Sequence, residues 1–197
     1  MSVAAWIVLG LVVVVALWAV SAYNRLVELR NRIANAFGQI DVQLKRRYDL
    51  IPNLVEVVRG YLQHEASTLE AVIQARGQAQ GAAAAARVAP TNAGAVGALA
   101  VAESALGASL GRLMVVSERY PDLKADATMQ SLSEELASTE NRVGFARQAF
   151  NDQVLDFNNA AQQFPALIVA RLAGFAPASM LESTRSEEER SAPQVKF

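Results

Sequence analysis

The first apolar run of the chain is continuous, whereas the later ones are periodic. Residues 3–20, VAAWIVLGLVVVVALWAV, carry no charged side chain. Beyond them, apolar residues recur at steps of three and four, the spacing of one face of an α-helix. Three such stripes are present: Leu26, Leu29, Ile33, Phe37, Ile40 and Leu44; Ile51, Leu54, Val58, Tyr61, Leu69 and Val72; and Met129, Leu132, Leu136, Val143, Ala146, Phe150, Phe157, Ala161 and Phe164. No stretch alternates with period two for long, so the pattern predicts an all-α protein.

Clusters of Gly and Pro divide the periodic part. Residues 81–97 form an Ala- and Gly-rich connector with its expected turn at Pro90-Thr91-Asn92. Residues 118–126 form another, in which Asp122 is placed to cap the next helix. We therefore expect four helices, near residues 24–47, 50–80, 93–119 and 123–163. Their lengths suit a long antiparallel four-helix bundle that follows an N-terminal transmembrane helix.

The end of the periodic part also carries stop signals. Pro165 starts a short segment, residues 166–173, and Gly174 is typical of its C-terminal stop. Residues 176–197 are polar, acidic and interrupted by Pro, which predicts an extended tail. The expected organisation is an anchor over residues 1–24, a bundle over 25–175, and this tail.

The join between the first two expected helices lies in QLKRRYDLIPN, residues 43–53. Lys45, Arg46 and Arg47 suit a last helical turn, where cations meet the negative end of the dipole. Asp49 would then cap a new helix, with Pro52 in its first turn. The alternative is one long helix that is kinked at Pro52, because the register almost persists. Since proline inside a helix costs about 3 kcal/mol or more, we favour a tight corner.

The N-terminal run is long enough to be a membrane anchor, because about 20 apolar residues span a bilayer as a helix. Trp6, Trp18 and Tyr23 lie towards its ends, where amphipathic rings favour the interface. A cleaved signal peptide is the alternative, since Val20-Ser21-Ala22 offers small residues. No cation precedes the run and the run is long, so a retained anchor is favoured.

The charges beside the anchor predict its orientation. Arg25, Arg30 and Arg32 follow the span closely, and no Lys or Arg precedes it. The positive-inside rule then places the N-terminus outside and the bundle in the cytoplasm, as a single-pass membrane protein.

Composition excludes most catalytic and metal chemistry. The chain has no cysteine and one histidine, His64, so thiolate sites and multi-imidazole metal sites are not expected. Residues 25–87 hold nine Lys and Arg against six Asp and Glu, and residues 88–197 hold nine against thirteen. Neither part is basic enough for nucleic acid, but the imbalance favours attraction between copies. We expect no enzyme, cofactor or metal.

Two polar groups have competing interpretations. Lys45, Arg46 and Arg47 could bind anionic lipid headgroups, but a structural role is favoured because they lie about 35 Å from the anchor along the helix. Asn151 and Asn158 lie seven residues apart, and each directly follows a Phe. Asn at heptad spacing more often fixes helix register than binds a ligand.

Three blocks together resemble one family. YNRLVELRNRIANAFGQIDVQLKRRYDLIPNLVEVVRGYLQHE, LGRLMVVSERYPDLKADATMQSLSEELASTENRV and FPALIVARLAGF are similar to the LemA family of bacterial membrane-anchored helical proteins, over about residues 23–175. The matching positions include Arg47, Asp49, Pro52, Asn53, Arg119, Tyr120, Pro121, Asp122, Leu123, Glu140, Asn141, Arg142, Asn151, Asn158, Phe164 and Pro165. The resemblance implies one membrane helix and a long antiparallel bundle, and supplies no catalytic residues.

The chain departs from the family pattern at two places. Phe150 and Phe157 stand where relatives usually have Tyr, and Met180-Leu181-Glu182 replaces a Tyr-Phe-Glu-like segment. The first departure argues against a role for a tyrosine hydroxyl, and the second leaves the docking of the tail open.

Two functional hypotheses follow. The first is a self-assembling, non-enzymatic scaffold that organises or remodels the membrane, supported by the many small residues of 82–86 and 98–108, which allow close helix approach. The second is an adaptor or sensor for a membrane protease or related complex. Its tail, ending PQVKF, would dock through Phe197, although a plain flexible terminus is an equal alternative.

Overall fold

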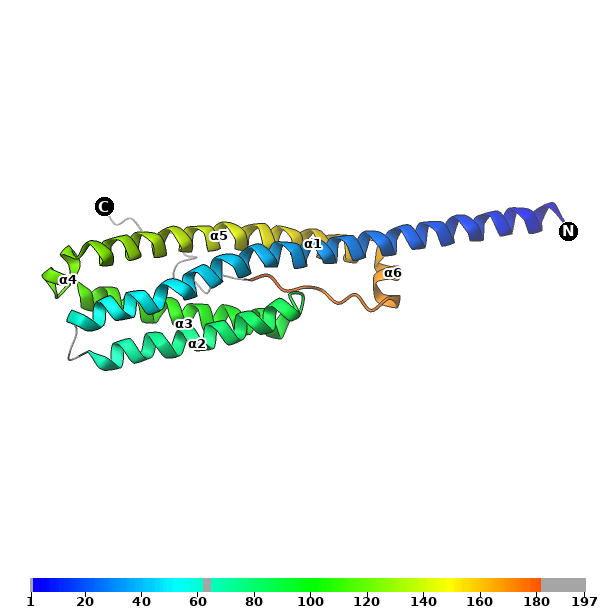
Figure 1. The fold of residues 1–197 in the computed structure, drawn as a ribbon. Coiled ribbons are helices and arrows are strands. Elements are labelled where there is room, and N and C mark those ends of the chain that lie inside the picture. The colour runs from blue at the N-terminus through cyan, green and yellow to red at the C-terminus, as the bar shows by residue number, and fades with distance from the viewer. Residues whose placement is uncertain (1, 62–64, 182–197) are drawn as a thin grey trace, which may run out of the picture.

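The structure is a computed structural model that describes residues 2–61 and 65–181, and within these residues it contains helices and no strand. Four long helices, α1 (Val3–Tyr61), α2 (Ala66–Val88), α3 (Ala93–Ser117) and α5 (Ala127–Gln162), run side by side (Figure 1). Two short helices, α4 (Pro121–Ala125) and α6 (Ala166–Leu172), flank α5. The predicted all-α bundle with an N-terminal apolar helix is confirmed.

Helix α1 is 59 residues long, and its two parts have different surroundings. Its first part projects from the bundle with apolar side chains exposed from Val3 to Val20. From Leu26 onward, one stripe is buried against the other helices, at the predicted positions. By length and composition, α1 and α3 are the two described helices that could cross a membrane. The apolar window of α1 has no buried residue, whereas α3 is partly buried in the bundle.

The predicted corner at residues 47–52 is wrong. Pro52 lies inside α1, which continues to Tyr61, and Asp49 is an exposed mid-helix residue rather than a cap. The expected helix over 50–80 is therefore divided, since α2 begins only at Ala66. The alternative of one helix through Pro52 is the observed one.

The remaining connections follow the sequence signals in part. Residues 89–92 connect α2 to α3, and the Asn92 side chain caps α3 by accepting from the Ala95 N–H at 2.9 Å. The predicted turn at Pro90-Thr91-Asn92 is confirmed, but the expected connector on either side of it is helical.

The prediction that Asp122 caps the long fourth helix is wrong. Pro121 begins the short helix α4, which places Asp122 in its first turn. The chain leaves this helix at Asp126, whose carboxylate caps α5 by accepting from the Met129 N–H at 2.9 Å. This backbone hydrogen bond is the main reason why the pKa of Asp126 lies below its usual value.

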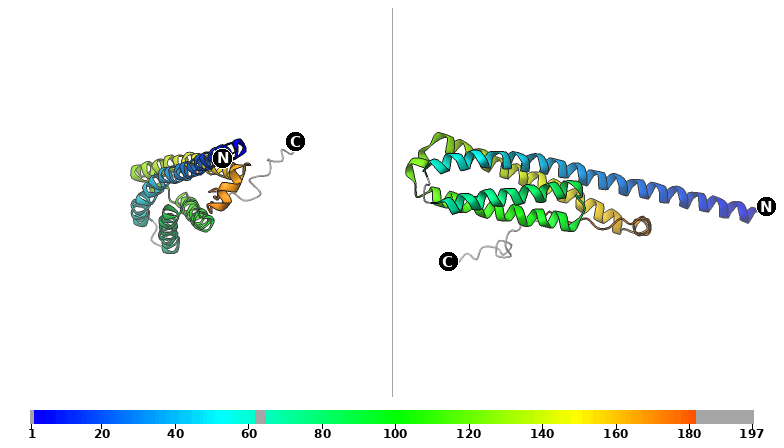
Figure 2. Two further views of the ribbon diagram at one scale, coloured as in Figure 1. Left: turned by 90° about the vertical axis from the view of Figure 1, so that its right-hand side faces the viewer. Right: turned by 60° about the horizontal axis from the view of Figure 1, so that its bottom comes forward.

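The four long helices pack as two antiparallel pairs. α1 lies against α5 along its length, α2 lies against α3, and α1 also contacts α2. Viewed from the N-terminal end, the two pairs form separate layers, with α6 crossing in front of them (Figure 2). Phe37 of α1 and Phe150 of α5 meet edge to face at 5.8 Å between ring centroids, within the core. The fully buried side chains of this core lie mainly on the predicted stripes.

The end of the described chain turns back over the bundle. Gly174 adopts a positive φ of 74° after α6, the backbone that a helix stop favours, and the Phe175 N–H donates to the Ala170 carbonyl at 2.9 Å. Residues 176–181 have no helix, yet Ala178 and Leu181 are buried. This part of the expected tail is therefore packed on the bundle.

Candidate functional site

A buried ionic cluster joins three helices at the middle of the bundle. Arg47 of α1 contacts Glu103 of α3 at 2.7 Å and Glu140 of α5 at 2.8 Å. The side chains of Arg47 and Glu103 are only 7% and 14% exposed, whereas that of Glu140 is 57% exposed. Burial makes the Arg47–Glu103 pair the energetically important one, since exposed ion pairs contribute little.

Tyr48 extends the cluster. Its hydroxyl donates to the second oxygen of the Glu103 carboxylate. Burial is the first cause that raises the pKa of Tyr48, followed by the negative charge of Glu103. The phenol therefore stays neutral and serves as a hydrogen-bond donor to a buried carboxylate.

The backbone of Tyr48 explains how α1 tolerates its proline. In an α-helix the carbonyl of residue 48 would accept from the N–H of residue 52, and Pro52 has none. The Nε of Arg76, on α2, donates to the Tyr48 carbonyl at 2.7 Å instead. A side chain from the neighbouring helix thus satisfies the backbone group that the proline leaves free.

The chemistry of this cluster is structural. Arg47, Glu103, Tyr48 and Arg76 are all engaged with one another or with backbone. Over residues 2–61 and 65–181, no group of three or more His, Cys, Asp or Glu side chains is placed to hold a metal ion. A buried charge is costly to leave unpaired, so the cluster favours the register in which Arg47 of α1 meets Glu103 of α3 and Glu140 of α5.

Two asparagines of α5 hold the extended segment by its backbone. Asn158 donates to the Ala178 carbonyl and accepts from the Ala178 N–H, both at 2.9 Å. Asn151 makes the same pair of bonds with Leu181, at 3.2 and 2.8 Å. Seven helical residues rise about 10.5 Å, and three extended residues span about 10 Å. The two spacings therefore match. We call Asn151 and Asn158, with their paired hydrogen bonds to the backbone of Leu181 and Ala178, the asparagine brackets.

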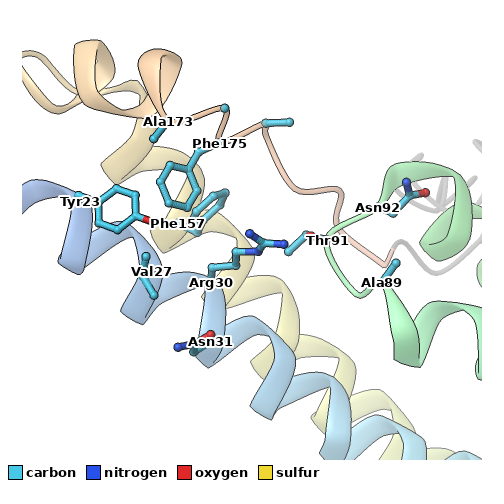
Figure 3. Close-up of a pocket in the computed structure, with 12 residues that line it drawn as sticks. Tyr23, Val27, Arg30, Asn31, Ala89, Thr91, Asn92, Phe157, Ala173 and Phe175 are labelled. Atoms are coloured by element: carbon cyan, nitrogen blue, oxygen red, sulfur yellow. The ribbon is translucent and has the colours of Figure 1, made fainter.

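A cavity of about 700 Å³ lies at the end of the bundle from which the anchor projects. Phe175 packs there between Tyr23, in a tilted contact, and Phe157, edge to face, with ring centroids 5.7 and 6.1 Å away. Figure 3 shows the Arg30 guanidinium reaching from α1 toward Thr91 in the α2–α3 turn. Among the described residues that line this cavity, Arg30 is the one cation.

A sequence model of the LemA family matches residues 36–197, most of the chain. The protein belongs to the LemA family. The magnetosome protein MamQ of Magnetospirillum gryphiswaldense is 33% identical over 82 residues, which cover 42% of this chain and 30% of MamQ. The match thus spans under a third of that relative. The family and the apolar part of α1 together indicate a membrane-associated protein.

The structure brings together some of the site residues predicted for this LemA family chain. Arg47 is in the buried cluster, and Asn151 and Asn158 bind backbone rather than fixing a helix–helix register. Arg46 pairs with Glu135 at 2.6 Å on the surface. The others lie apart from these groups: Lys45, Asp49, Pro52 and Asn53 are exposed on α1, Arg119 approaches Glu65 at 4.0 Å, and Tyr120, Pro121 and Asp122 form the start of α4.

Some predicted residues lie outside the described ones, and some important residues were missed. His64 and Phe197 are among residues 62–64 and 182–197, so the docking role of the tail stays a prediction. Glu103, Tyr48 and Arg76 were not singled out. Pro52 signals that the carbonyl four residues earlier needs another donor if the helix continues, but it does not identify Arg76 as that donor.

Proposed function

We propose that this protein is a non-enzymatic, membrane-anchored scaffold that assembles with itself through the outer face of α3. The described part of the chain supports this proposal by pairing its buried charges with one another. It also leaves one long helix face of small and apolar residues without a partner among residues 2–61 and 65–181.

The stripe on α3 carries the proposal. Exposed residues recur along this helix at alternating steps of four and three, which is the spacing of a coiled-coil seam. Six of the seven are small or apolar: Gly94, Ala98, Val101, Ala105, Ala108, Arg112 and Val115. The opposite face of α3 is buried in the bundle. Small residues let two helices approach closely, so this stripe fits the same stripe of a second copy.

The anchor favours one geometry for that pair. Two copies held in one membrane present α3 in the same direction, so a two-fold axis along the membrane normal brings identical stripes together. Residue 105 then faces residue 105 of the second copy. The arginines that follow the span would place these bundles in the cytoplasm, by the positive-inside rule.

Cysteine cross-linking tests the proposal, because the chain has no cysteine of its own. In the full-length protein in lipid nanodiscs or detergent, we expect Ala105→Cys to form a disulfide-linked dimer under mild oxidation. A disulfide requires Cα atoms within about 7 Å. The matched control is Ala137→Cys, on the exposed surface of α5, which should stay monomeric.

Mass measurement of the detergent-purified protein completes the test. The proposal predicts dimers or larger assemblies at micromolar concentration, and Ala105→Glu should shift them towards monomer while Ala137→Glu does not. A wild-type monomer at that concentration, or equal cross-linking at positions 105 and 137, would contradict the proposed interface.

A further inference from the structure

We propose that α6 and the turn before it form a second membrane contact: the short helix lies in the headgroup layer with Ile168 and Leu172 in the lipid interface, and the turn adds Phe164. This inference rests on the membrane anchor and is independent of whether the protein assembles with itself.

The position of α6 along α1 sets its level in the membrane. Residues 3–20 are the exposed apolar part of α1 and rise about 27 Å, close to the thickness of the hydrocarbon core. Tyr23 follows three residues later, about 4.5 Å beyond the end of that segment. Phe175, just after α6, contacts the Tyr23 ring at 5.7 Å. The headgroup layer is about 5–8 Å deep, so α6 lies at this layer.

The direction of α6 suits a surface helix. It packs against both α1 and α5, and it runs crosswise to the long helices at the end from which the anchor projects (Figures 1 and 2). A helix that crosses the axis of a membrane-spanning helix lies roughly along the membrane plane. Its apolar side chains can then enter the boundary between headgroups and acyl chains, as in interfacial helices.

The exposed face of α6 is apolar. Ile168 is 51% and Leu172 85% exposed, and their spacing of four places them along one side of the helix. Phe164, in the turn just before α6, is 81% exposed as well. Ala170 is buried. At about 100° per residue, Ile168 and Leu172 point away from the side on which Ala170 meets the bundle.

The neighbouring charge fits a headgroup layer as well. Arg171 is exposed beside Leu172. A long arginine side chain can keep its guanidinium among lipid phosphates while its stem covers apolar surface, and anionic lipids attract it. The combination of three exposed apolar residues and one cation at this level identifies lipid, rather than water, as the surroundings of this face.

The proposal can be tested with single-cysteine, full-length protein reconstituted at one copy per nanodisc. Ile168→Cys and Leu172→Cys are labelled with an environment-sensitive fluorophore, with Phe145→Cys as the matched control. Phe145 is 73% exposed on α5, a similar exposure at a position farther from the anchor. We expect blue-shifted emission at positions 168 and 172, several-fold stronger quenching by spin-labelled lipid than at position 145, and protection from iodide.

Two results would overturn the proposal. If the labels at 168 and 172 are quenched by iodide as strongly as the label at 145, this face of α6 is in water. If they are shielded from both iodide and spin-labelled lipid, protein covers the face instead. Because one copy per disc excludes the α3 pair, neither result depends on the proposed self-assembly.

Discussion

The ionic cluster around Arg47 and the asparagine brackets of α5 solve the same problem with different chemistry. In both places, side chains of one segment satisfy backbone or charged groups that another segment cannot satisfy alone. Arg76 supplies the donor that Pro52 lacks, and Asn151 and Asn158 supply the partners that an extended strand would find in a sheet. The first solution uses buried charge, and the second uses neutral amides.

The difference teaches where each solution is suitable. Removing one member of a buried charged pair leaves the other without compensation, so the cluster strongly specifies how the long helices meet. Each asparagine bracket binds only backbone atoms, so its loss frees only the local segment around Ala178 and Leu181. Charge therefore fixes the centre of the bundle, and neutral hydrogen bonds hold its outer layer.

The largest effect is expected for Arg47→Met, because Glu103 would remain mostly buried without its cation. We expect a loss of about 3–5 kcal/mol in the free energy of unfolding. Urea unfolding of the detergent-solubilised protein, followed by circular dichroism, measures it. Arg46→Met is the control, since its exposed pair with Glu135 should contribute about 0–1 kcal/mol. Equal losses in the two variants would remove the distinction between cluster and surface.

The brackets should give a smaller and local effect. Asn151→Ala and Asn158→Ala each remove two hydrogen bonds to partly buried backbone, worth about 1–3 kcal/mol for each bracket. We expect faster amide hydrogen exchange at Ala178 and Leu181, with little change in the core of α1. Exchange that also accelerates around Phe37 would show that the brackets are not local. Asn159→Ala, an exposed neighbour on α5, is the control.

The pairing of Pro52 with Arg76 can be isolated by a double-mutant cycle. Arg76→Met alone should cost about 1–2 kcal/mol, because it orphans the Tyr48 carbonyl. With Pro52→Ala, residue 52 regains an N–H that can reach this carbonyl, so Arg76→Met should cost less in that background. Thermal and urea unfolding of the four proteins gives the coupling energy. Strict additivity would mean that Arg76 does not replace the missing N–H.

Alkaline pH separates the buried phenol from an exposed one. The folded-state pKa of Tyr48 lies above its ordinary value of 10.0. From about pH 10 upward, the unfolded chain therefore loses a proton that the folded chain keeps, and stability falls as pH rises. Tyr48→Phe should flatten this fall in unfolding measurements. The pKa of Tyr61 is also raised, by its hydrogen bond to Asp126, but Tyr61 is exposed, so Tyr61→Phe should change the slope less.

The smallest effect is expected for Asp49→Ala. Asp49 is adjacent to the cluster in sequence but exposed in the middle of α1, so its replacement should change stability by no more than about 0.5 kcal/mol. Asn92→Ala removes a helix cap and should cost about 1 kcal/mol. If Asp49→Ala lowered stability in thermal unfolding more than Asn92→Ala does, Asp49 would act as a helix cap, as the predicted corner requires.

The sequence predicts features whose causes are local. The stripe from Leu26 to Leu44, the turn at Pro90-Thr91-Asn92 and the stop at Gly174 each depend on neighbouring residues, and each is confirmed. Whether Pro52 breaks a helix depends on Arg76, a residue 24 positions later in the chain. No local signal reports that partner.

The same limit applies to the functional residues. Asn151 and Asn158 stand out by their spacing, but their partners lie 30 and 20 residues away, respectively, in a segment without helical periodicity. Their predicted role in helix register was therefore different from the observed one. Likewise, Glu103 is a single acid in an Ala-rich stretch, and only the packing of α3 near α1 gives it a role.

The continuity of α1 has a mechanical consequence. Because the helix does not turn at Pro52, the exposed apolar segment of α1 and its segment in the bundle form one lever. From Tyr23 to Tyr61 the lever arm is about 57 Å. Transmembrane helices tilt by about 0–40°, and a change of about 10° would sweep the far end of the bundle sideways by about 10 Å. In the proposed membrane-anchored arrangement, a change in the tilt of the span would therefore appear as a displacement at α4, at the opposite end of the bundle.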